Sequence, residues 1–244
     1  MLGVPTDLSD TFTGWVRGVL EGGLKQEEVR LAARLNILHF FFAQVADRQA
    51  NPRENDLITT LLNSEIDGQK VPVEYVMGVC NLMLVAGVDT TWSSIGASLW
   101  HLAQHPEHRQ QLRDDPELWP AAVEELLRAY APVTMARIVD RDIDFQGCPM
   151  KAGDRVLMSF PAANRDPEQF ENPNEVIFDR EHNRHVAFGA GIHRCAGSNL
   201  ARLELRVALQ TWLERIPEFE LADPSTVTWA GGQVRGTRIA KVKF

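Results

Sequence analysis

Apolar residues recur at helical spacing through most of the chain, and this pattern predicts a mainly helical protein. A first helix is predicted over residues 6–21, and the glycines at 22 and 23 end it. Its apolar side carries Phe12, Trp15, Val16, Val19 and Leu20. A longer pattern predicts a helix over 26–49, which stops before Pro52, and a short helix follows over 55–63.

The longest predicted helix begins near Pro72 and ends near Gln104. Its middle breaks the pattern of an apolar core helix. Gly87 costs roughly 1 kcal/mol relative to alanine inside a helix, and Asp89 and Thr90 place polar groups in an apolar run. Such local exceptions often mark a functional site. The alternative is a helix with a solvated Asp-Thr pair.

Shorter elements fill the rest of the chain. Helices are predicted over 107–114 and 117–130. Alternation over 141–145 and the apolar segment 156–160 predict short strands around turns at Gly147 and Gly153. A last helix follows residue 195. Its apolar stripe consists of Leu205, Leu209, Trp212, Leu213 and Ile216.

Composition restricts the class of protein. The 244 residues suffice for one large domain, and the net charge of -8 argues against a nucleic-acid partner. Cys80, Cys148 and Cys195 are widely spaced and odd in number, which favours a reducing cytoplasm over a disulfide scaffold. The longest apolar run, 82–88, is too short to span a membrane, and we see no signal segment. We therefore expect a soluble cytoplasmic protein without a membrane anchor.

A glycine-rich loop, residues 188–197, delivers one cysteine to the start of the last helix. Unsatisfied N–H groups and the positive end of the helix dipole favour the thiolate of Cys195, which makes it an anionic metal ligand. One alternative is a buried, inert cysteine. A zinc site is disfavoured, because no second cysteine or histidine pair has zinc-ligand spacing. Arg194 occupies the third glycine position of a dinucleotide fingerprint, which excludes that motif.

The loop motif, Phe-Gly-x-Gly-x-His-x-Cys-x-Gly, resembles the haem-binding loop of the cytochrome P450 family. The resemblance implies that Cys195 is the proximal ligand of haem b iron and that His193 contacts a haem propionate. It also implies that Arg137 pairs with a propionate, the alternative being an exposed strand arginine. Further haem-contact positions implied by the family are Phe188, Gly189, Gly197, Ala86 and Gly87.

Two other motifs carry the same resemblance. Ala-Gly-x-Asp-Thr resembles the oxygen-binding groove of the family, so Asp89 and Thr90 match an acid–alcohol pair that delivers protons. Glu125 and Arg128 resemble the Glu-x-x-Arg pair of the haem-side core, with Arg180 as third member. Without the family, Glu125 and Arg128 would be an ordinary surface ion pair, and Glu124 could equally pair with Arg128.

The resemblance also suggests a substrate pocket, and the uneven distribution of charge suggests a surface for an electron donor. The substrate pocket would include Val133, Thr134, Gln233 and Val234. Between residues 180 and 206 five arginines, at 180, 184, 194, 202 and 206, face only two acids, Glu181 and Glu204. This excess is either an ordinary solvated face or a docking patch for an acidic electron carrier.

The fold expected from the resemblance is mainly α with small β-sheets, the C-terminal portion of the cytochrome P450 fold. Residues 1–244 would form a single incomplete haem domain. Its parts are roof helices and a short helix over 1–71, the long central helix over 72–105, helices, small sheets and a loop over 106–181, and the cysteine loop, following helix and C-terminal β region over 182–244. Because complete members have well over a hundred preceding residues, we interpret the chain as a fragment rather than a truncated protein.

The expected activity is that of a haem-thiolate monooxygenase, which inserts one oxygen atom of O2 into a small organic substrate. Electrons would come from a separate ferredoxin-type donor with its reductase, as in soluble bacterial members of the family. Two alternatives remain at this point. One is an inactive or haem-free fragment, and the other is a non-catalytic haem-binding protein.

Overall fold

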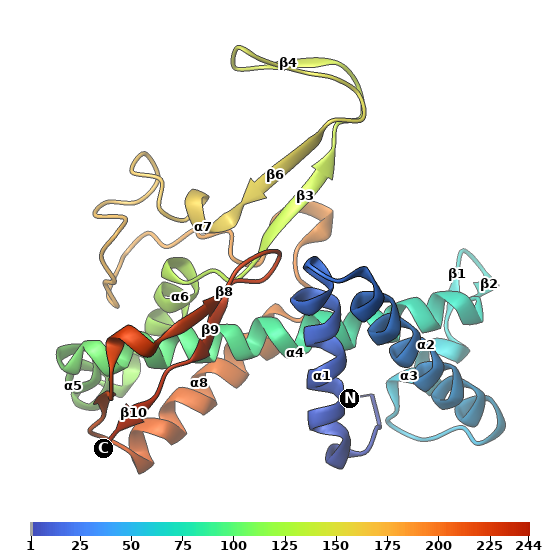
Figure 1. Cartoon of the computed structure of the whole chain (residues 1–244), viewed down its shortest axis with the longest axis horizontal. Helices are drawn as coiled ribbons and strands as arrows, with labels where there is room; N and C mark the ends of the chain where they lie inside the picture. The colour runs from blue at the N-terminus through green and yellow to red at the C-terminus, as the bar shows by residue number, and fades with distance from the viewer. Residues whose placement is uncertain (1) are drawn as a thin grey trace. The chain divides into compact units, whose positions relative to one another are not determined.

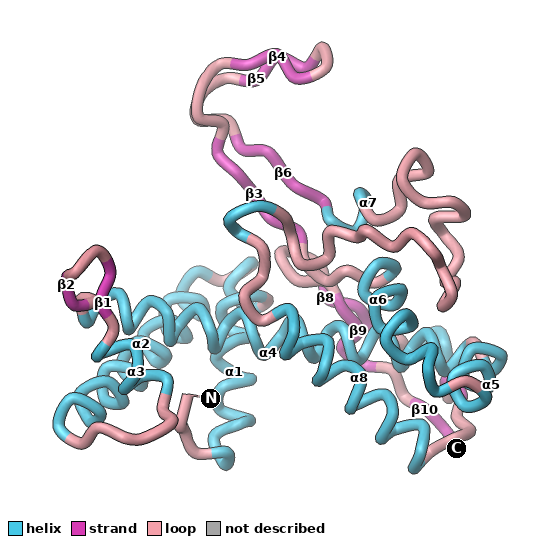
Figure 2. Tube along the Cα trace, turned by 180° about the vertical axis from the view of Figure 1, so that it is seen from behind, coloured by secondary structure: helices cyan, strands magenta, loops and turns pink. Residues whose placement is uncertain are grey.

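The computed structural model describes residues 2–244. The backbone groups into two compact units, residues 1–89 and 90–244, and each is described by itself. Helices and small antiparallel sheets make up both units, so the expected class, mainly α with small β-sheets, is confirmed (Figures 1 and 2). That all residues form one haem domain stays a prediction.

The first unit is built from helices and one small hairpin. Its elements are η1 (Thr6–Leu8), α1 (Ser9–Leu20), η2 (Gly22–Leu24), α2 (Glu27–Ala50), α3 (Leu57–Asn63), β1 (Glu65–Ile66) and β2 (Gln69–Lys70). The helix predicted over 6–21 is thus divided into a 3-10 turn and α1. The α1 and α2 helices pack closely, because a Cβ atom on Gly18 would lie 2.8 Å from the Cβ of Ala33.

Aromatic rings fill the interface between α1 and α2. The rings of Phe12 and Phe40 meet edge to face with their centroids 5.1 Å apart. Phe41 is buried, whereas its neighbour Phe42 is 67% exposed. The run of three phenylalanines, residues 40–42, therefore covers more than one face of α2.

Helix α4 (Val73–Gln104) is continuous through the boundary between the two units. By length and composition this helix could cross a membrane. The sequence did not indicate this, because the longest uninterrupted apolar run, 82–88, is short. The core helix of a soluble protein has the same properties, so length and composition are weak evidence for a membrane span.

The second unit holds the remaining elements. The helical ones are α5 (Pro106–Asp114), η3 (Pro116–Leu118), α6 (Trp119–Ala129), α7 (Phe160–Ala163), η4 (Gly191–His193), α8 (Ser198–Arg215) and η5 (Pro224–Thr226). The strands are β3 (Thr134–Ile138), β4 (Ile143–Phe145), β5 (Cys148–Met150), β6 (Arg155–Ser159), β7 (Glu220–Leu221), β8 (Thr228–Ala230), β9 (Gly236–Ile239) and β10 (Val242–Lys243).

One hydrophobic core unites the helices of this second unit. Leu102 of α4, Leu126 of α6 and Leu205 and Leu209 of α8 are all at most 1% exposed and belong to one cluster. Helix α8 also has a second apolar face, which is exposed to solvent: Leu203 on this face is 55% exposed. The stripe predicted for this helix therefore describes its buried face, and a further apolar face lies at the surface.

The strands of the second unit pair only as two-stranded antiparallel sheets among the residues described. Strands β3 and β6 form a long hairpin with Thr134 opposite Ser159, and the β4–β5 hairpin lies at its far end (Figure 1). The turn between β4 and β5 has positive φ at Gln146 and Gly147, 53° and 82°.

The C-terminal half of α4 lies very close to β9. A Cβ atom on Gly236 would come within 2.3 Å of the Cβ of Ser93, and one on Gly96 within 2.5 Å of the Thr237 hydroxyl. Arg238 of the same strand donates a hydrogen bond to the Ser93 hydroxyl at 3.0 Å. Because Gly236 on β9 and Gly96 on α4 have no Cβ atom, the strand can approach the helix backbone.

Candidate functional site

The loop at 188–197 presents Cys195 at the surface. Its backbone N–H donates a hydrogen bond to the carbonyl oxygen of Phe188 at 2.9 Å, which closes the loop. Gly189 and Gly191 have φ of 70° and 66°, values that other residues adopt only with strain. Helix α8 begins at Ser198, so the cysteine lies three residues before the helix rather than in its first turn.

The cysteine's environment fits an axial haem ligand. Cys195 is exposed, which contradicts the alternative of a buried, inert thiol. That description suits Cys80 instead, which is fully buried; burial, helped by the charge of Asp56, raises the pKa of its thiol to about 11. An accessible thiol on a loop of small residues can approach a large flat ligand.

Arg202 holds the cysteine loop against helix α6. Its Nε and Nη2 atoms donate to the two carboxylate oxygens of Glu124 at 2.5 and 2.8 Å. The same guanidinium lies over the ring of Phe188, 4.6 Å from the centroid. Hydrogen bonds to Glu124, and to a smaller extent the charge of Cys195, raise the pKa of Arg202.

Glu124 is itself strongly stabilised as a carboxylate. Burial would raise its pKa, but hydrogen bonds from Arg202 and His185 outweigh that effect and lower the pKa to about 2. Sequence reasoning weighed Glu124 only as a partner for Arg128. Its actual partners lie 61 and 78 residues away in the chain, beyond the reach of helix spacing rules.

Glu125 and Arg128 form a fully buried bidentate ion pair. Arg128 Nε and Nη2 donate to the two carboxylate oxygens, each at 2.8 Å, and both side chains are 0% exposed. The remaining Arg128 donors reach the backbone carbonyls of Asn164 at 2.8 Å, Pro173 at 2.8 Å and Glu175 at 2.7 Å. A surface ion pair is therefore excluded.

Arg180 completes this network from the carboxylate side. Its Nε atom donates to Glu125 at 3.1 Å, beside hydrogen bonds from the Ile177 amide at 2.9 Å and the Asn183 side chain at 3.0 Å. Buried charges are stable only when they are paired and hydrogen-bonded in this way. The structure thus brings Glu125, Arg128 and Arg180 together, with Glu125 as the partner of Arg128.

Asn164 links this network to the cysteine loop. Its side-chain oxygen accepts a hydrogen bond from the Val186 amide at 2.8 Å, two residues before Phe188. Its amide nitrogen donates to the Arg128 carbonyl at 3.3 Å. The buried ion pair therefore helps to position the chain that enters the loop.

The middle of α4 combines an open backbone with a buried acid. A Cβ atom on Gly87 would meet nothing within 4 Å, and Ala86 is exposed. Asp89 is only 2% exposed and Thr90 is half-buried, so the pair is not solvated. The roles of Ala86, Gly87, Asp89 and Thr90 toward haem and oxygen stay predictions.

The residues expected in the substrate pocket come from segments a hundred positions apart. Val133 pairs with Val234 in an isolated antiparallel bridge, and the Thr134 amide donates to the Gln233 carbonyl at 3.0 Å. The structure brings these four residues together through their backbones. Their contact with a substrate stays a prediction.

The expected propionate ligands are exposed. His193 lies in η4, and Arg137 of β3 donates to the neighbouring Ala136 carbonyl at 2.9 Å. Neither observation distinguishes a propionate ligand from an ordinary surface residue, so both assignments stay predictions.

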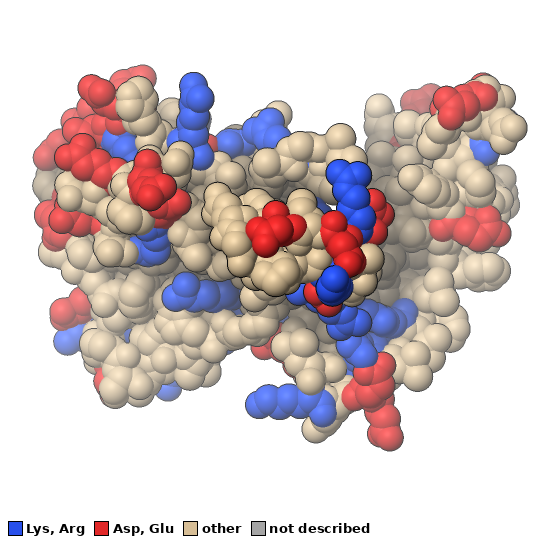
Figure 3. Space-filling model, turned by 90° about the horizontal axis from the view of Figure 1, so that it is seen from above, with Lys and Arg blue, Asp and Glu red and all other residues tan. Residues whose placement is uncertain are grey.

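The arginine-rich stretch is less basic than its composition indicates. Arg180 and Arg202 pair internally with Glu125 and Glu124, while the side chains at 184, 194 and 206 remain exposed. On the face drawn in Figure 3, basic and acidic side chains are interspersed.

A histidine cluster lies outside these motifs. One ring nitrogen each of His101, His105 and His108 lies within 4.8 Å of the others. The statement that no histidine pair has metal-ligand spacing is therefore wrong. The three residues lie on both sides of a helix break, since α4 ends at Gln104 and α5 begins at Pro106, so spacing rules for a single helix do not describe them.

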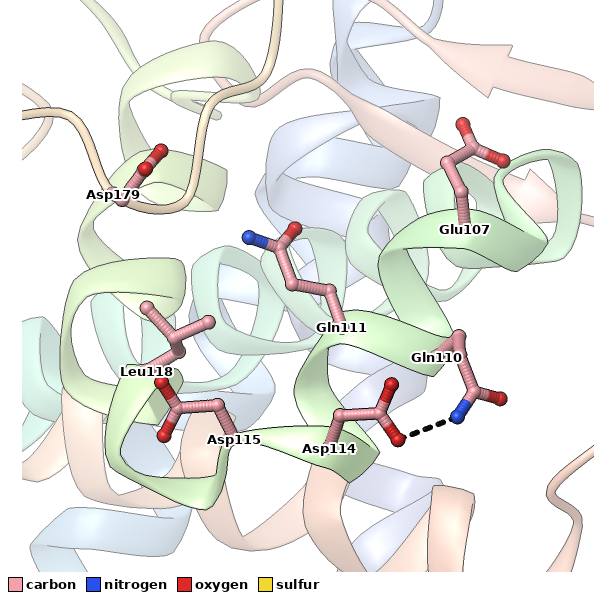
Figure 4. A pocket seen from close by; sticks show the side chains of 7 residues that line it. All are labelled: Glu107, Gln110, Gln111, Asp114, Asp115, Leu118 and Asp179. Carbon is pink, nitrogen blue, oxygen red and sulfur yellow. Dashed lines mark hydrogen bonds between the residues drawn. The ribbon is translucent and has the colours of Figure 1, made fainter.

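An acidic hollow lies beside α5. Figure 4 shows Asp114, Asp115 and Asp179 around it, and Gln110 donates to Asp114 at 2.6 Å. It is formed by α5, η3 and the loop of Asp179, so it is separate from the cysteine loop.

Comparison with known proteins identifies the family. The model of the cytochrome P450 family matches residues 9–228. Probable cytochrome P450 127A1 of Sinorhizobium fredii is 38% identical over 96% of this chain, and mycinamicin IV hydroxylase/epoxidase of Micromonospora griseorubida is 35% identical over 96%. The solved structure of the Bacillus subtilis cytochrome P450 PksS matches 99% of the chain with a TM-score of 0.91 and 34% identity.

This chain belongs to the cytochrome P450 family. It spans only part of its relatives: 56% of the Sinorhizobium protein, 60% of the Micromonospora enzyme and 63% of the PksS structure.

Proposed function

We propose that this chain is the haem-ligating portion of a cytochrome P450 monooxygenase that inserts one oxygen atom of O2 into a small organic substrate. The observation that carries the proposal is the exposed Cys195 thiol on a glycine loop tied down through Phe188 and Arg202. The names of relatives, which include a hydroxylase/epoxidase and an N-oxygenase, support the reaction class.

Haem b would be held by the Cys195 thiolate, and Phe188, Gly189 and Gly197 of the same loop would contact it. When bound, haem supplies the activation of O2 that side chains alone cannot perform. The Cys195 thiolate would donate electron density to the haem iron. His193 and Arg137 would bind the propionates as cationic or N–H donors.

Asp89 and Thr90 would handle protons. The Asp89 side chain is buried, and we propose that it passes protons to the Thr90 hydroxyl oxygen, Oγ1. Ala86 and Gly87 have little side-chain bulk, which would leave space beside the helix for the reacting ligand. Val133, Thr134, Gln233 and Val234 would contact the substrate.

Electrons would come from separate proteins, and the electron donor we propose is a ferredoxin-type protein with its reductase. The exposed side chains of Arg184, Arg194 and Arg206 would form part of a surface of this chain to which an acidic electron donor binds. We propose a cytoplasmic location, which agrees with electron transfer from a separate donor protein and its reductase.

Haem titration tests the proposal. The chain is titrated with haemin and followed by the Soret band, beside Cys195→Ser and the control Cys148→Ser, which removes another exposed thiol. We expect a thiolate-type spectrum in the wild type and in Cys148→Ser and its loss in Cys195→Ser. The same spectrum in all three would refute Cys195 as the ligand.

A further inference from the structure

His101, His105 and His108 meet where α4 ends and α5 begins. His101 lies in the last turn of α4, His105 is the N-cap residue of α5, and His108 lies in the first turn of that helix. The rings of His101 and His105 stack with centroids 4.2 Å apart. All three belong to the second unit, and none is part of the motifs assigned to haem, oxygen or substrate.

His101 is held in a defined orientation inside the protein. It is 2% exposed, and its Nδ1 atom lies 2.7 Å from the hydroxyl oxygen of Tyr130, the residue that follows α6. Metal-bound histidines typically donate their second ring N–H to an oxygen, which fixes the ring and its tautomer.

His105 is hydrogen-bonded to a carboxylate, another common partner of metal-bound histidines. Its Nδ1 atom donates to the Glu107 carboxylate at 2.7 Å, so Nε2 is the ring nitrogen left to bind an ion. A carboxylate behind a histidine raises the basicity of the ligating nitrogen. The His105 side chain is 41% exposed, so an ion can reach the cluster from solvent.

We propose that His101, His105 and His108 bind one divalent transition-metal ion, with Zn²⁺ as the best match to three imidazoles. A water molecule would complete the four-coordinate geometry that zinc prefers. The site would tie the end of α4 to α5 and, through Tyr130, to the end of α6.

We expect the ion to bind between His101 and His108, where the two rings now share a hydrogen bond. Nε2 of His101 and Nδ1 of His108 share one proton across 2.8 Å. Two nitrogen ligands of tetrahedral zinc, each about 2.0–2.1 Å from the metal, lie roughly 3.3 Å apart. The ion would take the place of that proton, which moves to the other ring nitrogen of the histidine that carried it, so each ring keeps one N–H. The half-buried His108, whose ring centroid lies 4.8 Å from that of Phe178, would turn slightly outward.

Zinc titration of the 244-residue chain tests this site. ZnCl2 is added during isothermal titration calorimetry to the wild type, His105→Ala, His108→Ala and the control His39→Ala, which removes an exposed histidine of α2. All cysteines stay in place, so any thiol binding is common to the four proteins. We expect the two cluster variants to lose one site or to bind it at least about 100-fold more weakly, and His39→Ala to match the wild type.

Histidine-ring NMR of the wild type gives a readout that does not depend on folding of the variants. One equivalent of Zn²⁺ should shift the signals of three histidines together and leave the other four unchanged, since the chain has seven. Equal zinc binding in all four proteins, no binding by the wild type, or three unperturbed cluster signals would each overturn the proposal.

Discussion

The guanidinium of Arg202 lies over the ring of Phe188 while both carboxylate oxygens of Glu124 accept its hydrogen bonds. Phe188 opens the cysteine loop, Arg202 lies on α8 and Glu124 on α6. Through these contacts Arg202 connects the cysteine loop, residues 188–197, to the core helices α6 and α8. This connection explains how a loop with several glycines and little burial of its own keeps Cys195 in place.

The Glu124 ion pair predicts a defined dependence of stability on pH. The folded carboxyl has a pKa of about 2, below its ordinary value of 4.5, so the pair stabilises the protein fully above pH 4.5 and loses this effect as the pH falls toward 2. At about 1.4 kcal/mol per pKa unit, the contribution is at most roughly 3.5 kcal/mol.

Urea denaturation of the wild type and Glu124→Gln from pH 7 to pH 3 measures this contribution. The difference in unfolding free energy between the two proteins should shrink as the pH falls below 4.5. A difference that stays constant over this range would contradict the ion-pair account.

Arg128→Ala should destabilise the chain by about 3–5 kcal/mol, because it leaves the buried Glu125 carboxylate without its main partner. Arg53→Ala is the matched control: Arg53 is 49% exposed in its ion pair with Asp47 and should cost about 1 kcal/mol or less. Chemical denaturation of both variants makes the comparison, and equal losses would show that Arg128 behaves as a surface residue.

Gly236→Ala should destabilise the second unit by about 1–3 kcal/mol, because the added Cβ would come within 2.3 Å of Ser93 on α4. Gly231→Ala is the control, since a Cβ there meets nothing within 4 Å. The melting temperatures of the two variants should differ clearly. Indistinguishable melting temperatures would mean that β9 can move away from α4 at little cost.

Thr90→Ala tests the proton-delivery proposal. Removing the hydroxyl should lower product formed per electron consumed by about tenfold or more, with peroxide made instead. Thr91→Ala removes the adjacent hydroxyl and should leave coupling near the wild-type value. Product, peroxide and electron consumption are measured together in the haem-loaded protein supplied with an electron donor. Unchanged coupling in Thr90→Ala would refute the assignment.

Local sequence patterns predicted the elements well and long-range contacts poorly. Helical periodicity placed α2, α4 and α8 within a few residues, because each buries an apolar stripe. The partners of Glu124 could not be predicted, since they meet it only through tertiary packing.

The candidate site shows the same division. Cys195, Glu125 and Arg128 were recognised from motifs, but the pairing register of Glu125 became definite only when Arg180, Ile177 and Asn183 were seen around its carboxylate. The histidine cluster was missed because its three residues cross the break between α4 and α5. A scan for ligand spacing across helix ends would have detected it.

The most direct test of the central claim is the carbon monoxide difference spectrum of this chain after haem loading and reduction. The account predicts the red-shifted Soret band of a thiolate-ligated adduct, present in the wild type and in Cys148→Ser. A band at the unshifted position in the wild type, from haem without a thiolate ligand, would contradict the assignment of Cys195 as the axial ligand.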